Sequence, residues 1–313
     1  MIDLNTIAEA SRRIAPYIHV TPILSNKTIN SMVGGTILFK CENFQKAGSF
    51  KIRGACNAVF SLSELQAKNG VCTHSSGNFG QALALAASYR GIQAHIVMPK
   101  TSSCVKVEAV KAYSGNVRFC EPNLMSREST AREVIDATGA AFIHPYDDYI
   151  IMSGQGTAIA EVMRSEQNID IVMTPVGGGG LISGTAVAAK SLNRKIWVIA
   201  AEPIQANDAF RSFYAKKWFP SENPDTIADG LLTSLGERNF ALILNFVDDI
   251  LTCREKSIYE AMRLIWERMK IIIEPSSAVP LACVLENKGI FENKTTCIVL
   301  SGGNIDLNRN WFS

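Results

Sequence analysis

The sequence predicts an open parallel α/β fold with helices on both faces of the sheet. Short runs rich in β-branched residues alternate with longer segments of helical pattern, which is typical of strand–helix–strand units. The helical segment 79–90 is apolar nearly all round, as expected of a helix buried between layers. The 313 residues, 47% hydrophobic and 19% charged, are enough for one large or two ordinary domains with a sizeable core.

The elements follow from this alternation in chain order. We expect strands at 36–40, 94–98, 117–119, 169–173, 196–200 and 296–300. We expect helices at 79–90, 104–113, 126–138, 155–167, 181–193 and 257–270. The window 70–146 has its own strand–helix alternation, so it is predicted as a small domain inserted into a larger one made of 1–69 and 147–313. His144, before Pro145, is expected to be a hinge or pocket-wall residue where the chain returns.

The net charge and the lengths of the apolar runs argue against nucleic acid and membranes as partners. The net charge is +2 and basic residues occur at most in pairs, so no nucleic acid is expected. No apolar run approaches the roughly 18 to 20 residues needed to cross a bilayer, and the first residues show no export signal. We therefore expect no membrane association and a cytoplasmic location. The eight scattered cysteines contain no CxxC pair and predict reduced core thiols.

Three clusters of glycine and serine follow predicted strands, at 75–78, 177–180 and 301–304. Because ligands of open α/β sheets bind at the carboxyl ends of strands, we expect these clusters to meet in one crevice. The second cluster precedes a helix expected to start at about Leu181, where unshielded N–H groups and the helix dipole favour a phosphate. It consists of Gly177, Gly178, Gly179 and Gly180.

Nucleotides fit these glycines poorly. The dinucleotide fingerprint G-x-G-x-x-G would have to end at Ile182 or Ser183, and no P-loop Gly-Lys-Ser/Thr follows. Glu202, at the end of the next strand, could still imitate the ribose-binding acid of a nicotinamide enzyme, so a dehydrogenase stays as an alternative.

Lys51 connects the glycine clusters to a known family. On spacing alone it would be an ordinary solvated lysine near a helix start. In context, the chain resembles the fold type II pyridoxal-phosphate enzymes, and among them most closely serine racemase and its serine/threonine and threo-3-hydroxyaspartate dehydratase relatives. This resemblance implies two open twisted parallel-sheet domains, the smaller inserted in the larger, and a homodimer. The matching segments, in the family's order, are 49–54, 75–78, 176–180, 226–230, 274–276 and 300–304.

The resemblance also implies the contacts of the cofactor, pyridoxal 5′-phosphate. Lys51 would hold it as a Schiff base and act as base on one face of the substrate Cα. Phe50 would pack against the ring, Asn78 would bond its 3′-oxygen, and the four glycines would hold the phosphate. Ser301 would face the pyridine nitrogen. Since a hydroxyl does not keep that nitrogen protonated, elimination of a β-hydroxyl can compete with reprotonation.

Ser76 bears on the choice between two activities. Threonine dehydratases of this group commonly have alanine there, whereas racemases have a serine that protonates the Cα face opposite the lysine. Lys51 and Ser76 would then interconvert L- and D-serine, with accompanying elimination to pyruvate and ammonia. The alternative is a threonine/serine or threo-3-hydroxyaspartate dehydratase without significant racemase activity, in which Ser76 only bonds the substrate. A non-catalytic pyridoxal-phosphate carrier would share Lys51 but would not need Ser76.

The resemblance extends to the substrate pocket. The loop that begins at Ser75 would bind the substrate carboxylate through its N–H groups. Arg127 and Ser234 match positions near the pocket, although an exposed helix charge is the alternative for Arg127. Phe79 stands where relatives usually have histidine, so the preference among small hydroxy amino acids stays open.

Two accessory sites are implied as well. Glu202, the carbonyl of Ala206 and Asp208 match the family's divalent-cation site, whose oxygen donors suit Mg²⁺, Ca²⁺ or Mn²⁺. Another group of residues matches nucleotide-site positions, but Ala47 replaces a threonine of the ATP-contacting loop in animal racemases, so enzymes with and without ATP activation are both compatible with the sequence. The matching residues are Lys46, Gln81 and Tyr113.

Overall fold

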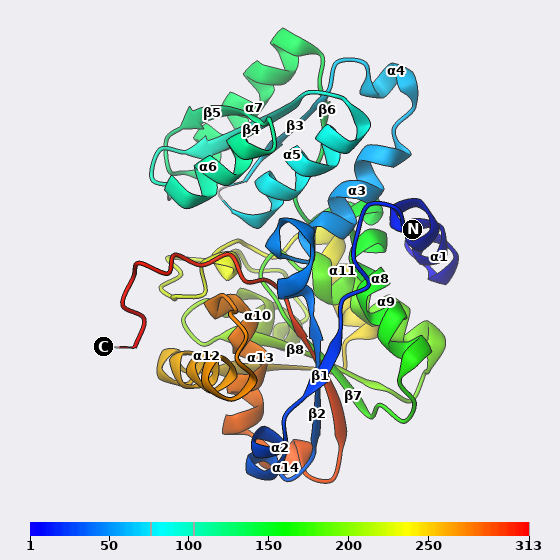
Figure 1. Cartoon of the computed structure of the whole chain (residues 1–313), viewed down its shortest axis with the longest axis vertical. Helices are drawn as coiled ribbons and strands as arrows, with labels where there is room; N and C mark the ends of the chain where they lie inside the picture. Colours follow the sequence, from blue (N-terminus) through cyan, green and yellow to red (C-terminus); the bar gives the residue numbers. More distant parts are fainter. Residues whose placement is uncertain (76, 103, 313) are drawn as a thin grey trace.

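The computed structural model describes residues 1–75, 77–102 and 104–312 and contains two sheets, one above the other in Figure 1. The larger sheet has six strands in the order β1-β2-β10-β7-β8-β9. Its strands pair in parallel except β1 with β2, which are antiparallel. These strands are β1 (Ile23–Ser25), β2 (Thr36–Cys41), β7 (Ile171–Pro175), β8 (Trp197–Pro203), β9 (Asp249–Cys253) and β10 (Thr295–Leu300).

The smaller sheet has four parallel strands in the order β5-β4-β3-β6. It lies between β2 and β7 in the chain, which confirms the predicted fold class of a smaller unit inserted in a larger one. The domain boundaries at 70 and 146 stay predictions. Its elements are β3 (Val71–His74), α5 (Asn78–Arg90), β4 (Ala94–Pro99), α6 (Cys104–Ala112), β5 (Asn116–Cys120), α7 (Leu124–Thr138) and β6 (Ala141–Phe142).

Helices cover both faces of the larger sheet. Successive side chains of a strand point to opposite faces, and in β7 Ile171 and Met173 join one buried cluster while Val172 joins another. The first cluster includes residues of α2 (Lys27–Val33), α12 (Glu255–Met269) and α13 (Pro275–Glu286). The second includes residues of α1 (Leu4–Ile14), α8 (Tyr149–Ser165), α9 (Gly180–Leu192), α10 (Asp208–Ala215) and α11 (Glu237–Phe246). The remaining helices are α3 (Lys51–Ser61), α4 (Glu64–Ala67) and α14 (Lys288–Phe291), with 3-10 turns η1 (Glu42–Phe44), η2 (Lys46–Gly48) and η3 (Asp229–Leu231).

All six predicted strands and all six predicted helices are present, with shifted ends. The helix expected from 155 begins at Tyr149, because the Asp148 carboxylate caps it by accepting the Ile150 N–H at 2.7 Å. As predicted, α5 is buried from Phe79 to Ala87. The alternation did not predict the short strands β1 and β6, the edge strand β9, or helices such as α13, whose pattern Pro280 interrupts.

The cysteines and apolar segments agree with most of the expectations. All eight cysteines carry free thiols, and seven are buried; Cys104 is exposed, so the prediction of a core thiol was wrong there. Among the helices that the structure describes, none has both the length and the apolar character needed to cross a membrane.

Candidate active site

Lys51 is the first residue of α3, a helix that lies between the two sheet units in Figure 1. Its Nζ donates to the Pro145 carbonyl at 3.3 Å and lies 5.0 Å from the Phe50 ring centroid and 5.9 Å from that of Phe79. Burial lowers the pKa of Lys51 to about 8, and the nearby Glu274 charge partly opposes this shift. The amine is therefore far more often neutral, and nucleophilic, than that of an ordinary lysine.

The turn before α3 fixes the position of Lys51. Gly48 has φ +67°, and a Cβ there would lie 2.3 Å from the Asn304 Oδ1. The Phe50 N–H donates to the Ser301 carbonyl at 3.0 Å, which ties the turn to the end of β10. Within α3, the buried Arg53 donates to Glu42 at 2.7 Å and to Glu161 on α8 at 2.6 Å. These contacts anchor the start of the helix to the body of the large sheet.

Asn78, the last residue of the first cluster, contacts Asn304, the last residue of the third. Its Nδ2 donates to both carboxylate oxygens of Glu274, at 2.8 and 3.0 Å, and its Oδ1 accepts from Asn304 Nδ2 at 3.0 Å. Burial and the charge of Asp229 raise the pKa of Glu274 to about 7. Glu274 and Asn304 belong to matching segments, but no role was predicted for either residue.

The tetraglycine follows β7 and leads into α9. Its residues are buried, and a Cβ on Gly178 would lie 2.4 Å from the Tyr146 ring. Gly179 has φ +95°, and a Cβ there would lie 2.6 Å from that of Asn239. Within the described ranges, no hydrogen bond uses the N–H groups of Gly178 and Gly179, and no side chain caps α9. Bare N–H groups at a buried helix N-terminus fit a phosphate.

Ser301 and Phe50 lie beside this loop. Phe50 packs with Leu181 and Val299 in a small apolar cluster. The Ser301 Oγ lies 3.0 Å from the Ser277 Oγ. The Ser277 hydroxyl in turn donates to the Gly302 carbonyl at 2.7 Å. The contact of the Ser301 hydroxyl with the pyridine nitrogen, which the resemblance implies, stays a prediction.

The chain crosses between the sheets at 144–147. His144 Nδ1 accepts the Asp147 N–H at 2.8 Å, and burial lowers the pKa of His144 to about 4, so the ring is neutral. The Asp147 carboxylate accepts the N–H groups of Arg238 and Asn239 at 3.1 and 3.2 Å, at the start of α11. This crossover thus supplies the carbonyl that binds Lys51 and the Tyr146 ring that covers Gly178.

Two serines expected to contact the substrate bond to other parts of the protein, and the substrate contacts stay predictions. Ser75 Oγ accepts the Gly77 N–H at 3.3 Å, Ser234 Oγ accepts the Ser221 N–H at 3.0 Å, and Phe79 is buried. Arg127 on α7 is half-buried, and its Nε has no hydrogen-bond partner in the part of the chain that the structure describes. Its charge also lowers the pKa of His74, after the larger effect of burial. Ser76 lies outside the described residues.

Glu202 and Asp208 lie together at the end of β8 and the start of α10. The Glu202 oxygens accept the N–H groups of Ala209 and Phe210 at 3.1 and 2.8 Å, so Glu202 caps α10. Burial and the Asp208 charge raise the pKa of Glu202 well above its usual range, and burial raises that of Asp208 to about 6. The buried Oδ1 of Asp208 has no hydrogen-bond partner among the described residues. The buried Ala206 lies between these acids in the chain.

The three residues that match nucleotide-site positions have separate surroundings. Lys46 Nζ lies 5.3 Å from the Tyr89 ring centroid, Gln81 is buried on α5, and Tyr113 packs at the edge of the cluster that contains α5 residues. No hydrogen bond within the described ranges joins them.

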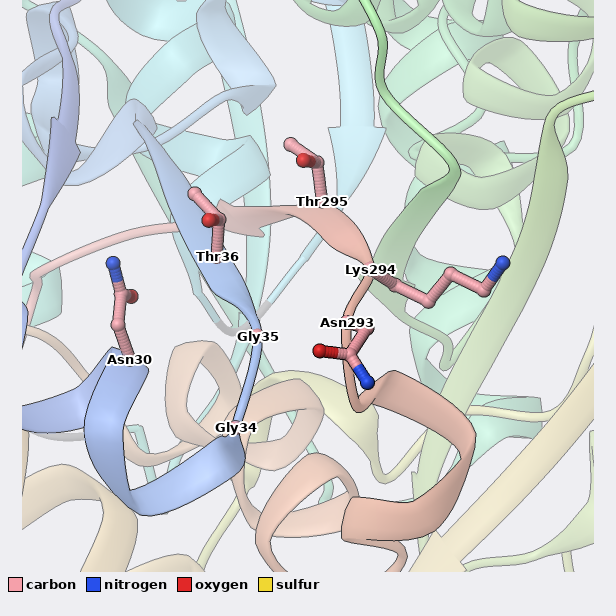
Figure 2. A pocket seen from close by; sticks show the side chains of 7 residues that line it. All are labelled: Asn30, Gly34, Gly35, Thr36, Asn293, Lys294 and Thr295. Atoms are coloured by element: carbon pink, nitrogen blue, oxygen red, sulfur yellow. The ribbon is translucent and has the colours of Figure 1, made fainter.

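A separate hollow of about 370 Å³ opens at the amino ends of β2 and β10, the opposite end of these strands from Ser301 (Figure 2). In Figure 2 the Lys294 side chain points away from Asn30 and Thr36. The converging glycine and serine clusters, and not this hollow, form the candidate active site.

A buried lysine of lowered pKa and a buried glycine loop at a helix N-terminus both contact the crossover, at Pro145 and Tyr146, and this combination fits a pyridoxal-phosphate site. The chain matches the family described as "Pyridoxal-phosphate dependent enzyme" over residues 14–302 and belongs to it. Its cofactor is therefore pyridoxal phosphate.

Individual relatives place the chain more narrowly within this family. It is 48% identical over 311 residues to serine racemase of Dictyostelium discoideum, covering 98% of this chain and 96% of the relative. It is 45% identical to beta-hydroxyaspartate dehydratase of Paracoccus denitrificans, covering 96% and 95%. The structure of maize serine racemase superposes with a TM-score of 0.97 at 44% identity, covering 99% and 95% of the two chains. These matches confirm the resemblance inferred from the six segments.

Proposed function

We propose that this enzyme interconverts L- and D-serine and also eliminates water from serine, after which hydrolysis by one water gives pyruvate and ammonia. The full-length similarity to serine racemases carries the proposal. The lowered pKa of Lys51 supports it, because a neutral amine can take the proton of the substrate Cα. The neutral hydroxyl of Ser301 supports it, because a hydroxyl does not keep the pyridine nitrogen protonated and elimination can then accompany racemization.

The residues of the site have distinct roles in this proposal. The N–H groups of the tetraglycine hold the phosphate, Phe50 packs against the ring, Asn78 bonds the 3′-oxygen and Ser301 contacts the ring nitrogen. When bound, the cofactor supplies an electron sink for the substrate Cα. The Lys51 amine removes or returns the Cα proton on one face, and the Ser76 hydroxyl does so on the other.

The substrate is a small hydroxy amino acid. Its carboxylate binds to the loop of Ser75 and Ser76, with Phe79 as part of the wall, and Arg127 and Ser234 lie near its side chain. A second candidate is a dehydratase of threonine, serine or 3-hydroxyaspartate without significant racemase activity. The beta-hydroxyaspartate dehydratase relative favours this candidate.

Accessory ligands complete the proposal. Glu202, the Ala206 carbonyl and Asp208 bind Mg²⁺, Ca²⁺ or Mn²⁺, because two buried acids repel each other and an unpaired carboxylate oxygen suits a hard cation. An ATP site at Lys46, Gln81 and Tyr113 and the homodimer rest on the resemblance alone, and the cytoplasmic location stays a prediction.

A panel of substrates in deuterated water tests the activity. The holoenzyme is incubated with L-serine, D-serine, L-threonine and the 3-hydroxyaspartate isomers, and the D-product, keto acid and Cα deuterium are scored together. We expect L-serine to give both D-serine and pyruvate. Keto acid without any D-serine would establish the dehydratase instead.

A further inference from the structure

Lys106 and Asp229 form an ion pair between the two sheet units. Lys106 lies on α6 beside the smaller sheet, and Asp229 lies in η3, in the connection between α10 and α11 of the larger unit. The two residues are 123 positions apart in the chain. The Lys106 side chain is 19% exposed and that of Asp229 is 46% exposed, so the pair is partly screened from solvent.

Each partner is attached to a different part of the active site. Lys106 Nζ lies 3.7 Å from the position that a Cβ would take on Gly77, in the loop that leads to Asn78. On the other side, the neighbouring Gly230 donates its N–H to Ser276 at 3.1 Å, and its carbonyl lies 3.2 Å from the corresponding Cβ position of Gly177. The ion pair thus connects the loop before Asn78, which is expected to bind the substrate, to the tetraglycine loop, which is expected to bind the phosphate.

A second contact joins the same two units nearby, between Asn78 and Glu274. The charges of Asp229 and Lys106 act in opposite directions on the pKa of Glu274, which also acts on the pKa of Lys51. The ion pair therefore lies close enough to the site to influence both its geometry and its charge.

We propose that Lys106 and Asp229 are positioning residues that hold the smaller unit over the site, so that the substrate loop stays at the correct distance from Lys51. This inference rests on the proposed function only for its kinetic consequence. We call the arrangement with the smaller unit held over the site the closed form. Loss of the pair would lower the fraction of molecules in this form, and the apparent affinity for substrate would fall by the same factor. Saturating substrate would restore closure, so the effect would appear in KM and not in kcat.

The test compares Lys106→Met and Asp229→Asn with Lys106→Arg and with the double exchange Lys106→Asp/Asp229→Lys, all as holoenzymes. Lys100→Met is the matched control, because Lys100 pairs with Glu121 at 2.5 Å on the exposed surface of the smaller unit alone. We expect each neutral variant to raise the KM for L-serine by about 3- to 10-fold, with kcat changed less than about twofold. Lys106→Arg and the double exchange should recover most of the loss.

Hydrogen–deuterium exchange of α6 and of the first turn of α5, without substrate, gives a readout that does not depend on activity. Both neutral variants should exchange faster there, and Lys100→Met should match the unaltered chain. Unchanged exchange in both neutral variants would overturn the proposal whatever reaction the enzyme catalyses. A raised KM in Lys106→Met with none in Asp229→Asn would also overturn it, because Lys106 would then bind the substrate carboxylate directly.

Discussion

Lys51 is an amine enclosed by two aromatic rings and the Pro145 carbonyl, and this environment decides its protonation. Burial disfavours the ammonium form, whereas the Glu274 carboxylate favours it. Burial has the larger effect, so the pKa falls below that of a free lysine, which is about 10.4. The same side chain can then bind the cofactor aldehyde and exchange protons with a substrate near neutral pH.

The pH dependence of cofactor binding tests this account. Only the neutral amine attacks an aldehyde, so the rate at which cofactor-free protein captures pyridoxal phosphate should rise about tenfold per pH unit below the pKa of about 8 and level off above it. Stopped-flow absorbance measures this rate. Glu274→Gln removes a charge that raises the pKa of Lys51, so its midpoint should move to lower pH. A rate that still rises steeply above pH 9.5 would contradict the account.

At the scale of elements, the turn between β7 and α9 requires residues without side chains. A Cβ on Gly178 would lie 2.4 Å from the Tyr146 ring, whereas one on Gly289 in α14 would meet nothing within 4 Å. Gly178→Ala should therefore destabilise the fold by about 1 to 3 kcal/mol and weaken cofactor binding about tenfold or more. Gly289→Ala is the control and should be neutral or slightly stabilising. Thermal unfolding and cofactor titration measure both effects, and equal behaviour of the two variants would refute the close contact.

The junction of β8 and α10 places two acids in a buried position, where a cation would offset their repulsion. Removing divalent cations with a chelator should lower the midpoint of thermal unfolding by about 2 to 5 °C. Adding back Mg²⁺, Ca²⁺ or Mn²⁺ should restore it, with the strongest cation identified by titration calorimetry. Asp208→Asn should lose this response. A chelator that leaves both stability and rate unchanged would argue against the cation.

For the whole molecule, we predict a homodimer in solution, as the resemblance implies. Light scattering coupled to size exclusion should give about twice the chain mass of 34.1 kDa. Dilution over the micromolar range would reveal a weak association. A mass near that of one chain at every concentration would contradict the prediction.

Local patterns predicted much of this molecule but not its long-range contacts. The alternation of strands and helices predicted the parallel sheets, and the glycine and serine clusters predicted where their strand ends meet. No role was predicted for Glu274 and Asn304, because they contact Asn78 across 196 and 226 positions of the chain. The ion pair of Lys106 and Asp229 was not predicted for the same reason. Such contacts depend on how the two units pack together, which no local pattern encodes.

The most direct test of the central proposal uses Ser76→Ala with L-serine in deuterated water. If Lys51 and Ser76 act on opposite faces of the Cα, the variant should lose D-serine formation by about 100-fold or more. It should keep pyruvate formation within about threefold, and the recovered L-serine should still gain Cα deuterium through Lys51. Equal loss of D-serine, pyruvate and deuterium exchange would contradict the assignment of Ser76 as the second acid–base group.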